Sequence, residues 1–205
     1  MSEILAVPRA GFSLEEPWDI PGACTPVALR RATDGAAPRL ATTFAAYFDD
    51  QYLTLVFIGE DDHVVATHFE HDAPLYEEDV VEAFLAPACV EEYFELEVSP
   101  RGTTFDARLE SPDGIRQTMK TDRSWTCEGL IAAVRLTGTT FETVLRIPFR
   151  ALGCETPETG ETWRANFFRI DRHPEAGDDY AAWSPTLKTP ADFHVAHAFG
   201  TLRFS

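Results

Sequence analysis

The chain has 205 residues, of which 44% are hydrophobic and 25% are charged, and its formal net charge is -17. This composition predicts one soluble globular domain over residues 1–205, with a core that begins at about residue 20. A core of this size needs neither a disulfide nor a metal ion to stabilise it. So acidic a surface repels phosphate backbones and anionic lipid headgroups. It argues against nucleic acid and membranes as partners and favours neutral ligands such as sugars, cations or basic proteins.

The N-terminal segment up to Asp19 lacks a basic stretch followed by an apolar one, so it does not resemble a signal peptide. No apolar run approaches the ~18–20 residues that a membrane span needs. We therefore expect a cytoplasmic protein, or an extracellular one if an upstream signal has been removed. The four cysteines have no metal-binding spacing and are expected to be buried free thiols unless the chain is exported: Cys24, Cys89, Cys127 and Cys154.

Short segments that alternate apolar and polar residues run along the chain, separated by Gly, Pro, Asp and Asn. This pattern is typical of β-strands with one buried face. In chain order, we expect strands at Thr42–Phe48, Tyr52–Phe57, Val64–Phe69, Val80–Leu85, Tyr93–Ser99, Thr103–Leu109, Leu130–Leu136, Phe141–Ile147, Trp163–Ile170 and Thr201–Phe204.

Two pairs of these segments are close enough to form hairpins. Tyr93–Ser99 and Thr103–Leu109 flank a Pro-Arg-Gly turn, and a Thr-Gly-Thr-Thr turn follows Leu130–Leu136. Within the YFELEVS strand, the Phe, Leu and Val are predicted to face the core, and the Tyr and both Glu to form a polar outer face.

Helical signals are weak, since only Phe149–Leu152, closed by Gly153, resembles a helical turn. Many short strands without intervening helices predict an all-β fold. The expected architecture is a sandwich of two antiparallel sheets.

Catalytic signatures are missing from the sequence: it has no GxSxG elbow, HExxH motif, P-loop or GxGxxG loop. Glycoside hydrolysis needs two carboxyl groups facing each other across a cleft, which a sequence does not reveal. We therefore expect a protein that is not an enzyme.

Two groups of residues could bind a metal. His63, His68 and His71 lie close in sequence, but the odd spacing of the first two would place them on opposite faces of a strand, so solvated side chains are the favoured interpretation. Aspartates suit calcium, which prefers several oxygen ligands, and the candidates for a structural Ca²⁺ site are Asp61, Asp72 and Asp79.

The aromatic residues are more informative, because the C–H faces of a sugar can stack on Trp or Tyr rings. Trp183 lies in a Tyr-Ala-Ala-Trp-Ser-Pro segment expected to be a loop, and Tyr76 lies in a loop before a strand. Trp163 shares a strand face with apolar residues and is expected in the core, and Trp18 and Trp125 are expected to be structural.

Five segments, taken in order, resemble the family 9 carbohydrate-binding modules, best the family 9-like branch within the DOMON-like superfamily. The resemblance runs from about Phe44 to Phe204, nearly the whole chain. Its motifs are Glu78–Phe84, Tyr93–Gly102, Trp163–Ile170, Ala182–Pro185 and Phe193–Phe204.

The resemblance implies a β-sandwich with Ig-like topology that binds a mono- or oligosaccharide between two aromatic rings, with calcium as structural support. On this chain the two rings are Trp183 and Tyr76. Glu82 and Asn166 would then hold the sugar hydroxyls.

Glu97 stands where sugar-binding members carry an arginine, so Arg108 or Arg169 is expected to supply the replacement cation. The superfamily also includes haem domains with Met and His ligands. Met119 with His194 or His173 would be the ligands here, and we expect no haem.

We therefore predict non-catalytic carbohydrate binding, linked to carbohydrate catabolism. The alternatives are an accessory or interaction β-sandwich without a sugar ligand, and a domain associated with a glycoside hydrolase of the xylanase type.

Overall fold

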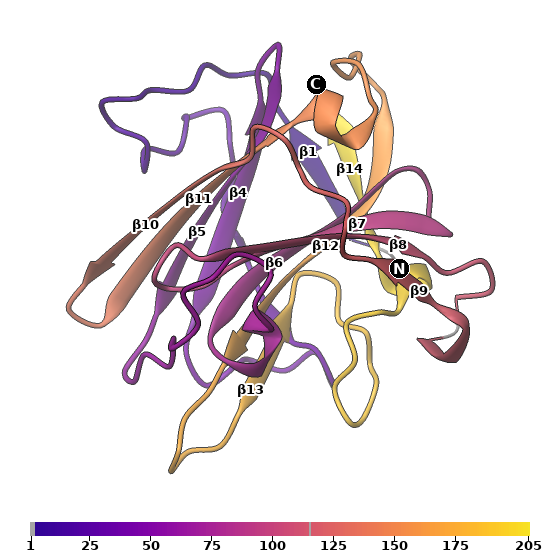
Figure 1. The fold of residues 1–205 in the computed structure, drawn as a ribbon. Helices are drawn as coiled ribbons and strands as arrows, with labels where there is room; N and C mark the ends of the chain where they lie inside the picture. The colour runs from indigo at the N-terminus through magenta and orange to yellow at the C-terminus, as the bar shows by residue number, and fades with distance from the viewer. Residues whose placement is uncertain (1–2, 115) are drawn as a thin grey trace.

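The computed structural model describes residues 3–114 and 116–205, which form two β-sheets packed as layers (Figure 1). The strands are β1 (Ile4–Val7), β2 (Val27–Ala28), β3 (Arg30–Arg31), β4 (Thr42–Phe48), β5 (Tyr52–Glu60), β6 (Val80–Cys89), β7 (Glu92–Val98), β8 (Thr104–Glu110), β9 (Lys120–Asp122), β10 (Ile131–Thr137), β11 (Thr140–Pro148), β12 (Thr162–Asp171), β13 (Asp179–Ala182) and β14 (Gly200–Phe204). Four short 3-10 helices are η1 (Leu75–Glu77), η2 (Arg116–Thr118), η3 (Phe149–Leu152) and η4 (Ala196–Ala198).

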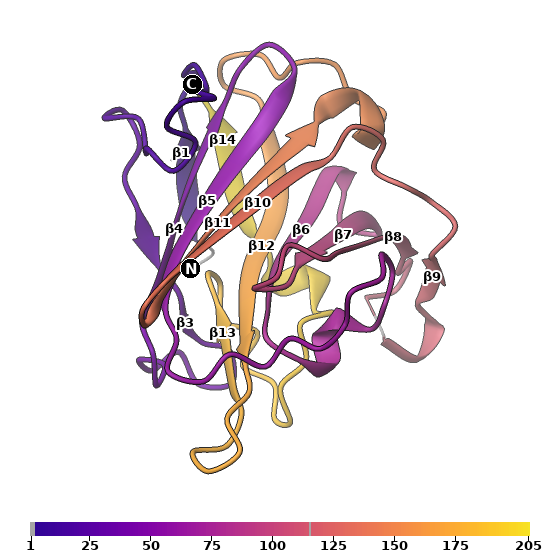
Figure 2. The ribbon, with the colours of Figure 1, turned by 60° about the vertical axis from the view of Figure 1, so that its left-hand side comes forward.

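The larger sheet has the order β1-β14-β12-β6-β7-β8-β9, and β13 and β3 extend it beside β12. The smaller sheet has the order β10-β11-β5-β4-β2. Figure 2 shows β4, β5, β11 and β10 in one layer and β6, β7 and β8 in the other. The predicted all-β sandwich is confirmed. Its strands pair antiparallel, except that β1 and β14 run parallel.

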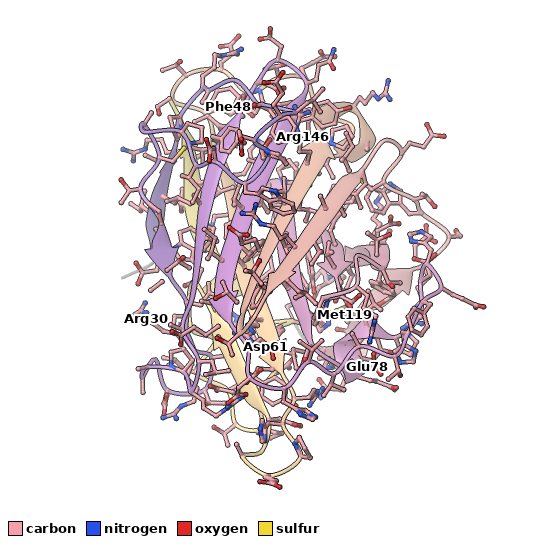
Figure 3. The ribbon with its side chains drawn as sticks, turned by 90° about the vertical axis from the view of Figure 1, so that its left-hand side faces the viewer. Arg30, Phe48, Asp61, Glu78, Met119 and Arg146 are labelled. Atoms are coloured by element: carbon pink, nitrogen blue, oxygen red, sulfur yellow. The ribbon has the colours of Figure 1, made fainter. Side chains whose placement is uncertain are left out.

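Figure 3 shows Arg146, on β11, and Asp61, just after β5, toward opposite ends of the smaller sheet. The expected hairpins are confirmed, since β7 pairs with β8 and β10 pairs with β11. The expected helical turn is η3, and Gly153 ends it with a φ of 70°, a left-handed conformation that favours glycine.

The segment Val64–Phe69 was expected to be a strand, and this prediction is wrong. The segment joins no ladder. The backbone N–H of Val65 donates to the carboxylate of Asp79, and those of Thr67 and His68 donate to Glu78. Two acidic side chains therefore satisfy the amides that a neighbouring strand would otherwise pair.

The main core lies between the sheets, where Phe44, Phe57, Leu96, Trp163 and Phe167 are buried. A second apolar cluster lies on the outer face of the larger sheet, and it includes Phe84, Tyr93, Phe105, Phe168 and Phe193. The YFELEVS strand was expected to present a polar face to solvent, which is wrong, because both of its faces are buried.

The cysteines form no disulfide within the described residues. Cys127 is buried as expected, but Cys89 is exposed, and Cys24 and Cys154 are half-buried. No helix among the described residues is long and apolar enough to cross a bilayer.

Candidate functional site

A pocket of about 610 Å³ lies over the outer face of the larger sheet. The sheet supplies its floor, and three connecting segments supply its walls: the turn at η1, the stretch from η2 to β9, and the segment before η4. We call it the outer pocket. It is lined by Tyr76, Glu82, Glu95, Phe105, Arg116, Met119, Thr121, Arg123, Ile170, Tyr180, Lys188, Thr189, Pro190, Ala191, Asp192, Phe193 and His194.

Three glutamates form what we call the carboxyl cluster: Glu82 and Glu95 line the floor, and Glu97 lies beside them. Glu82 and Glu97 face each other across the β6–β7 ladder, and Glu95 lies two residues from Glu97 on the same face of β7. One carboxylate oxygen from each lies within 4.8 Å of the others. Within the described chain, Oε1 of Glu82 and both oxygens of Glu97 have no hydrogen-bond partner.

Burial dominates the electrostatics of the carboxyl cluster. It raises the pKa of Glu95 to about 7, although the charge of Arg116 opposes the rise. The pKa values of Glu82 and Glu97 are also raised, first by burial and then by the neighbouring carboxylates. The cluster therefore holds protons near neutral pH, and its carboxyl groups can both donate and accept hydrogen bonds.

His194, in the segment before η4, adds a further polar group to the outer pocket. Burial lowers its pKa to about 4, so the ring is neutral near pH 7. Its Nδ1 lies 2.9 Å from the hydroxyl of Tyr93, and its Nε2 lies 3.8 Å from Oε1 of Glu95. A neutral imidazole adds a further donor or acceptor without adding charge.

Aromatic rings and cations form the walls. Tyr76 is 38% exposed and Tyr180 is half-buried. Arg172 joins their two segments, because it donates to the backbone carbonyl of Tyr76 at 2.7 Å and to the hydroxyl of Tyr180 at 2.5 Å. Arg123 donates to the Tyr76 hydroxyl at 3.2 Å. The pocket thus combines partly exposed rings with carboxyl, guanidinium and imidazole groups, a lining suited to a small polar ligand with apolar faces.

Two of the predicted sugar-binding residues lie in this pocket, namely Tyr76 on the wall and Glu82 on the floor. Trp183 does not. It is 2% exposed and lies in the core between the sheets, with ring centroids 5.6 Å from Phe167 and 5.9 Å from Phe44. The expectation that a sugar binds between Trp183 and Tyr76 is therefore wrong.

Asn166 and Arg169 are both buried and already bonded. The amide of Asn166 donates to the carbonyl of Ser184 at 2.8 Å and accepts from the N–H of the same residue at 2.9 Å. Arg169 donates to Asp171 at 3.0 Å and to Asp61 at 3.3 Å. Asn166 thus fixes the segment after β13 to β12, and Arg169 ties the ends of β12 and β5 together.

Arg108, the other candidate cation, lies outside the outer pocket. Its guanidinium is partly exposed and pairs with Glu92 at 2.7 Å. It lines a separate depression with Phe94 and Trp125.

The three candidate calcium ligands do not form one set. Asp79 accepts hydrogen bonds from the N–H groups of Val65 and Arg172, one on each oxygen. The two oxygens of Asp61 are occupied by the N–H of His63 and by Arg169. Each of these four oxygens accepts one hydrogen bond, and Asp72 lies elsewhere, beside Asp106 on β8. The calcium site stays a prediction.

Of the residues considered for haem, Met119 and His194 both contact the hydroxyl of Tyr93, and the O–H lies 3.2 Å from the Met119 sulfur. His173 contacts the ring of His63 instead. The expected absence of haem stays a prediction.

Sequence reasoning missed several residues of the outer pocket, including Tyr180, Phe193 and Glu95. For Tyr180 a signal was available. β13 alternates, so Tyr180 and Ala182 face the outer cluster, whereas Ala181 and Trp183 face the main core. The alternation along this segment could therefore have identified Tyr180, rather than Trp183, as the ring that lines the pocket.

The chain is similar in sequence to known proteins. A family model described as "Carbohydrate-binding family 9" matches residues 35–204. A curated relative from Arthroderma benhamiae, called "Extracellular protein", is 27% identical over 182 residues, which cover 80% of this chain and 78% of that protein.

Solved structures share the fold. A protein from Bacteroides uniformis superposes with a TM-score of 0.80 at 17% identity and full coverage of both chains. A family 9 module from Caldicellulosiruptor kristjanssonii, solved with cellotriose, gives 0.73 at 13% identity, covering 99% of this chain and 94% of that one. The module solved with glucose gives 0.71 at 12% identity, covering 99% and 96%.

Proposed function

The chain belongs to carbohydrate-binding family 9, and from this premise we propose that the outer pocket binds one or a few sugar residues without catalysing a reaction. The observation that carries the proposal is the combination in one 610 Å³ pocket of partly exposed tyrosine rings with buried carboxyl groups. Tyr76 and Tyr180 offer faces for sugar C–H groups, and Glu82 and Glu95 offer partners for hydroxyls.

The electrostatics of the carboxyl cluster support the binding of an uncharged ligand. Burial raises the pKa of all three members, that of Glu95 to about 7, so protonated carboxyl groups are present near neutral pH. The cluster is therefore suited to hydrogen bonding with a neutral ligand.

The relative from Arthroderma benhamiae is called an extracellular protein. As part of the proposal, we infer that this chain also acts outside the cell. The alternative expectation, a cytoplasmic protein, has no support from the comparisons.

Titration calorimetry with glucose and cellotriose tests the proposal, because related modules were solved with these sugars. Replacing Tyr76 or Tyr180 by alanine should weaken binding by roughly fivefold, since one lost ring–sugar contact is worth about 1 kcal/mol. Arg108→Ala is the matched control, because it removes a large side chain outside the outer pocket, and affinity should not change.

A glycan array extends the search if neither sugar binds. If the wild type binds no saccharide on the array, the proposal fails, and an interaction module without a sugar ligand becomes the better account. If Arg108→Ala weakens binding as much as Tyr76→Ala does, the site is not the outer pocket.

A further inference from the structure

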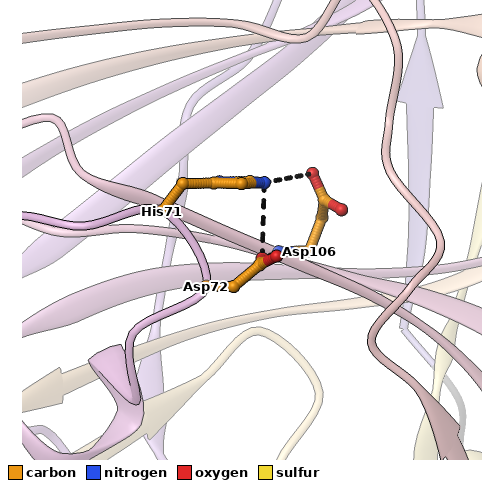
Figure 4. Close-up of side chains that lie close together, drawn as sticks. All are labelled: His71, Asp72 and Asp106. Atoms are coloured by element: carbon orange, nitrogen blue, oxygen red, sulfur yellow. Dashed lines mark hydrogen bonds and ion pairs between the residues drawn. The ribbon is translucent and has the colours of Figure 1, made fainter.

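A second cluster of polar side chains lies outside the outer pocket, at the join between the loop before η1 and strand β8. It consists of His71, Asp72 and Asp106 (Figure 4). Nε2 of His71 lies 3.4 Å from Oδ1 of Asp72 and 3.8 Å from Oδ2 of Asp106. We propose that these three side chains bind a divalent transition-metal ion of the Zn²⁺ class.

The histidine is oriented for such a role. Its Nδ1 lies 2.9 Å from the backbone carbonyl oxygen of Thr104. A carbonyl oxygen only accepts, so Nδ1 carries the proton, and in the neutral ring Nε2 presents its lone pair to the two carboxylates. Metal-binding histidines are commonly held in this way, with the second nitrogen donating to a carbonyl or carboxylate.

The spacing of the three groups also fits a shared ion. Distances of 3.4 and 3.8 Å are too long for good N–H···O hydrogen bonds, which cluster at about 2.7–3.2 Å. Ligands bound tetrahedrally at about 2.0–2.2 Å lie roughly 3.3–3.6 Å apart. The observed separations are close to that spacing and need only a small contraction.

Burial of Asp106 gives an independent reason to expect a cation. Its side chain is 1% exposed; the carboxylate accepts a hydrogen bond from the backbone N–H of Cys127, but its Oδ1 has no hydrogen-bond partner within the described chain. A buried carboxylate without sufficient partners is costly, and a bound cation would remove that cost. The side chain of His71 is 45% exposed, so an ion can enter and keep a water as its fourth ligand.

The local backbone fixes the ligands relative to one another. Asp72 has a φ of 63°, and its N–H donates to the carbonyl of Thr104 at 3.1 Å. The N–H of Asp106 lies 3.3 Å from Oδ1 of Asp72. The imidazole distinguishes this set from a calcium site, because hard cations take oxygen ligands and imidazole favours zinc, copper, iron or nickel.

The site lies beside the outer pocket, since Phe105 lines that pocket and Tyr76 follows Asp72 by four residues. An ion at this point would tie the loop that carries Tyr76 to β8. The metal proposal does not depend on sugar binding, and its test uses metal alone.

The experiment is titration of the chelator-treated full chain with Zn²⁺ by calorimetry, and with Co²⁺ by visible absorption. We expect one ion per chain, a rise in thermal stability with metal, and binding at least tenfold weaker in His71→Ala and in Asp106→Asn. His173→Ala is the matched control, because His173 and His63 form another histidine pair, with ring centroids 5.2 Å apart, outside the proposed site.

If Asp106→Asn fails to fold, His71→Ala carries the test alone, since His71 is half-exposed and its loss should leave the fold intact. Absence of Zn²⁺ and Co²⁺ binding by the wild type would overturn the proposal. So would unchanged affinity in His71→Ala, or binding that disappears in His173→Ala instead. In those cases the three side chains form only a polar contact without an ion.

Discussion

Replacing Glu97 by glutamine tests the electrostatics of the carboxyl cluster. Glu97 is 0% exposed, neither of its oxygens has a partner in the described part of the chain, and Glu82 lies directly opposite. The amide would keep the shape of the side chain and remove one buried charge. We expect the Glu97→Gln variant to be more stable than the wild type above neutral pH and nearly unchanged near pH 5.

The sign follows from proton linkage. A carboxyl group whose pKa is higher in the folded protein binds more protons in the folded state, so stability falls as pH rises from the unfolded pKa to the folded pKa. For Glu95 that window runs from 4.5 to about 7. At about 1.4 kcal/mol for each pKa unit, the loss across the window is on the order of 3 kcal/mol. Removing the charge of Glu97 should raise the free energy of unfolding by about 1–3 kcal/mol at about pH 8.

Urea unfolding at constant ionic strength, followed by circular dichroism between about pH 5 and pH 8, measures the effect. Glu175→Gln is the control, because it removes one negative charge from an exposed position. The reasoning fails if Glu97→Gln destabilises the protein at about pH 8, or if the wild type shows no loss of stability across this range, since either result means that the buried carboxylates have partners.

Two further substitutions test the residues that were expected to bind sugar and lie in the interior instead. Trp183→Ala should lower the free energy of unfolding in urea by about 3–5 kcal/mol, because it leaves a cavity in the core. It should not change sugar affinity as long as the protein stays folded. A loss of affinity without a loss of stability would contradict the placement of Trp183 in the core. Arg169→Met should cost about 3–5 kcal/mol, since Asp61 and Asp171 would lose their shared cation; a cost below about 1 kcal/mol would show that the two carboxylates find other partners.

Much of the fold was predictable because alternation is a local signal. β7 and β8 are close in sequence, and the turn between them contains a glycine with a φ of 81°, so both the strands and their pairing follow from the residues. Val64–Phe69 contains Val, Thr and Phe, which favour strands, yet it is not a strand. Its amides bond to Glu78 and Asp79, and side-chain partners of that kind leave no mark on hydrophobic periodicity.

The site was less predictable because its parts come from distant segments. The polar residues that alternate along β7 predicted a face exposed to solvent. That face is instead covered by loops and forms part of the pocket floor. Glu82 was identified through resemblance, but its neighbours Glu95 and Glu97 depend on how β6 pairs with β7. Similarly, His71 and Asp106 meet only because the loop before η1 bonds to β8.

The parallel pairing of β1 with β14 has a consequence for how the chain is made. Ile4 pairs with Thr201 and Val7 with Phe204, so β1 leaves the ribosome long before its partner. Until β14 emerges, β1 has no partner in the sheet, and the neighbouring edge of β12 stays open there. Contacts of such long sequence separation slow folding and leave unpaired edges exposed to other chains. The period of synthesis is therefore when this protein is most prone to aggregate, and a chain stalled before residue 200 would lack the strand that closes that edge.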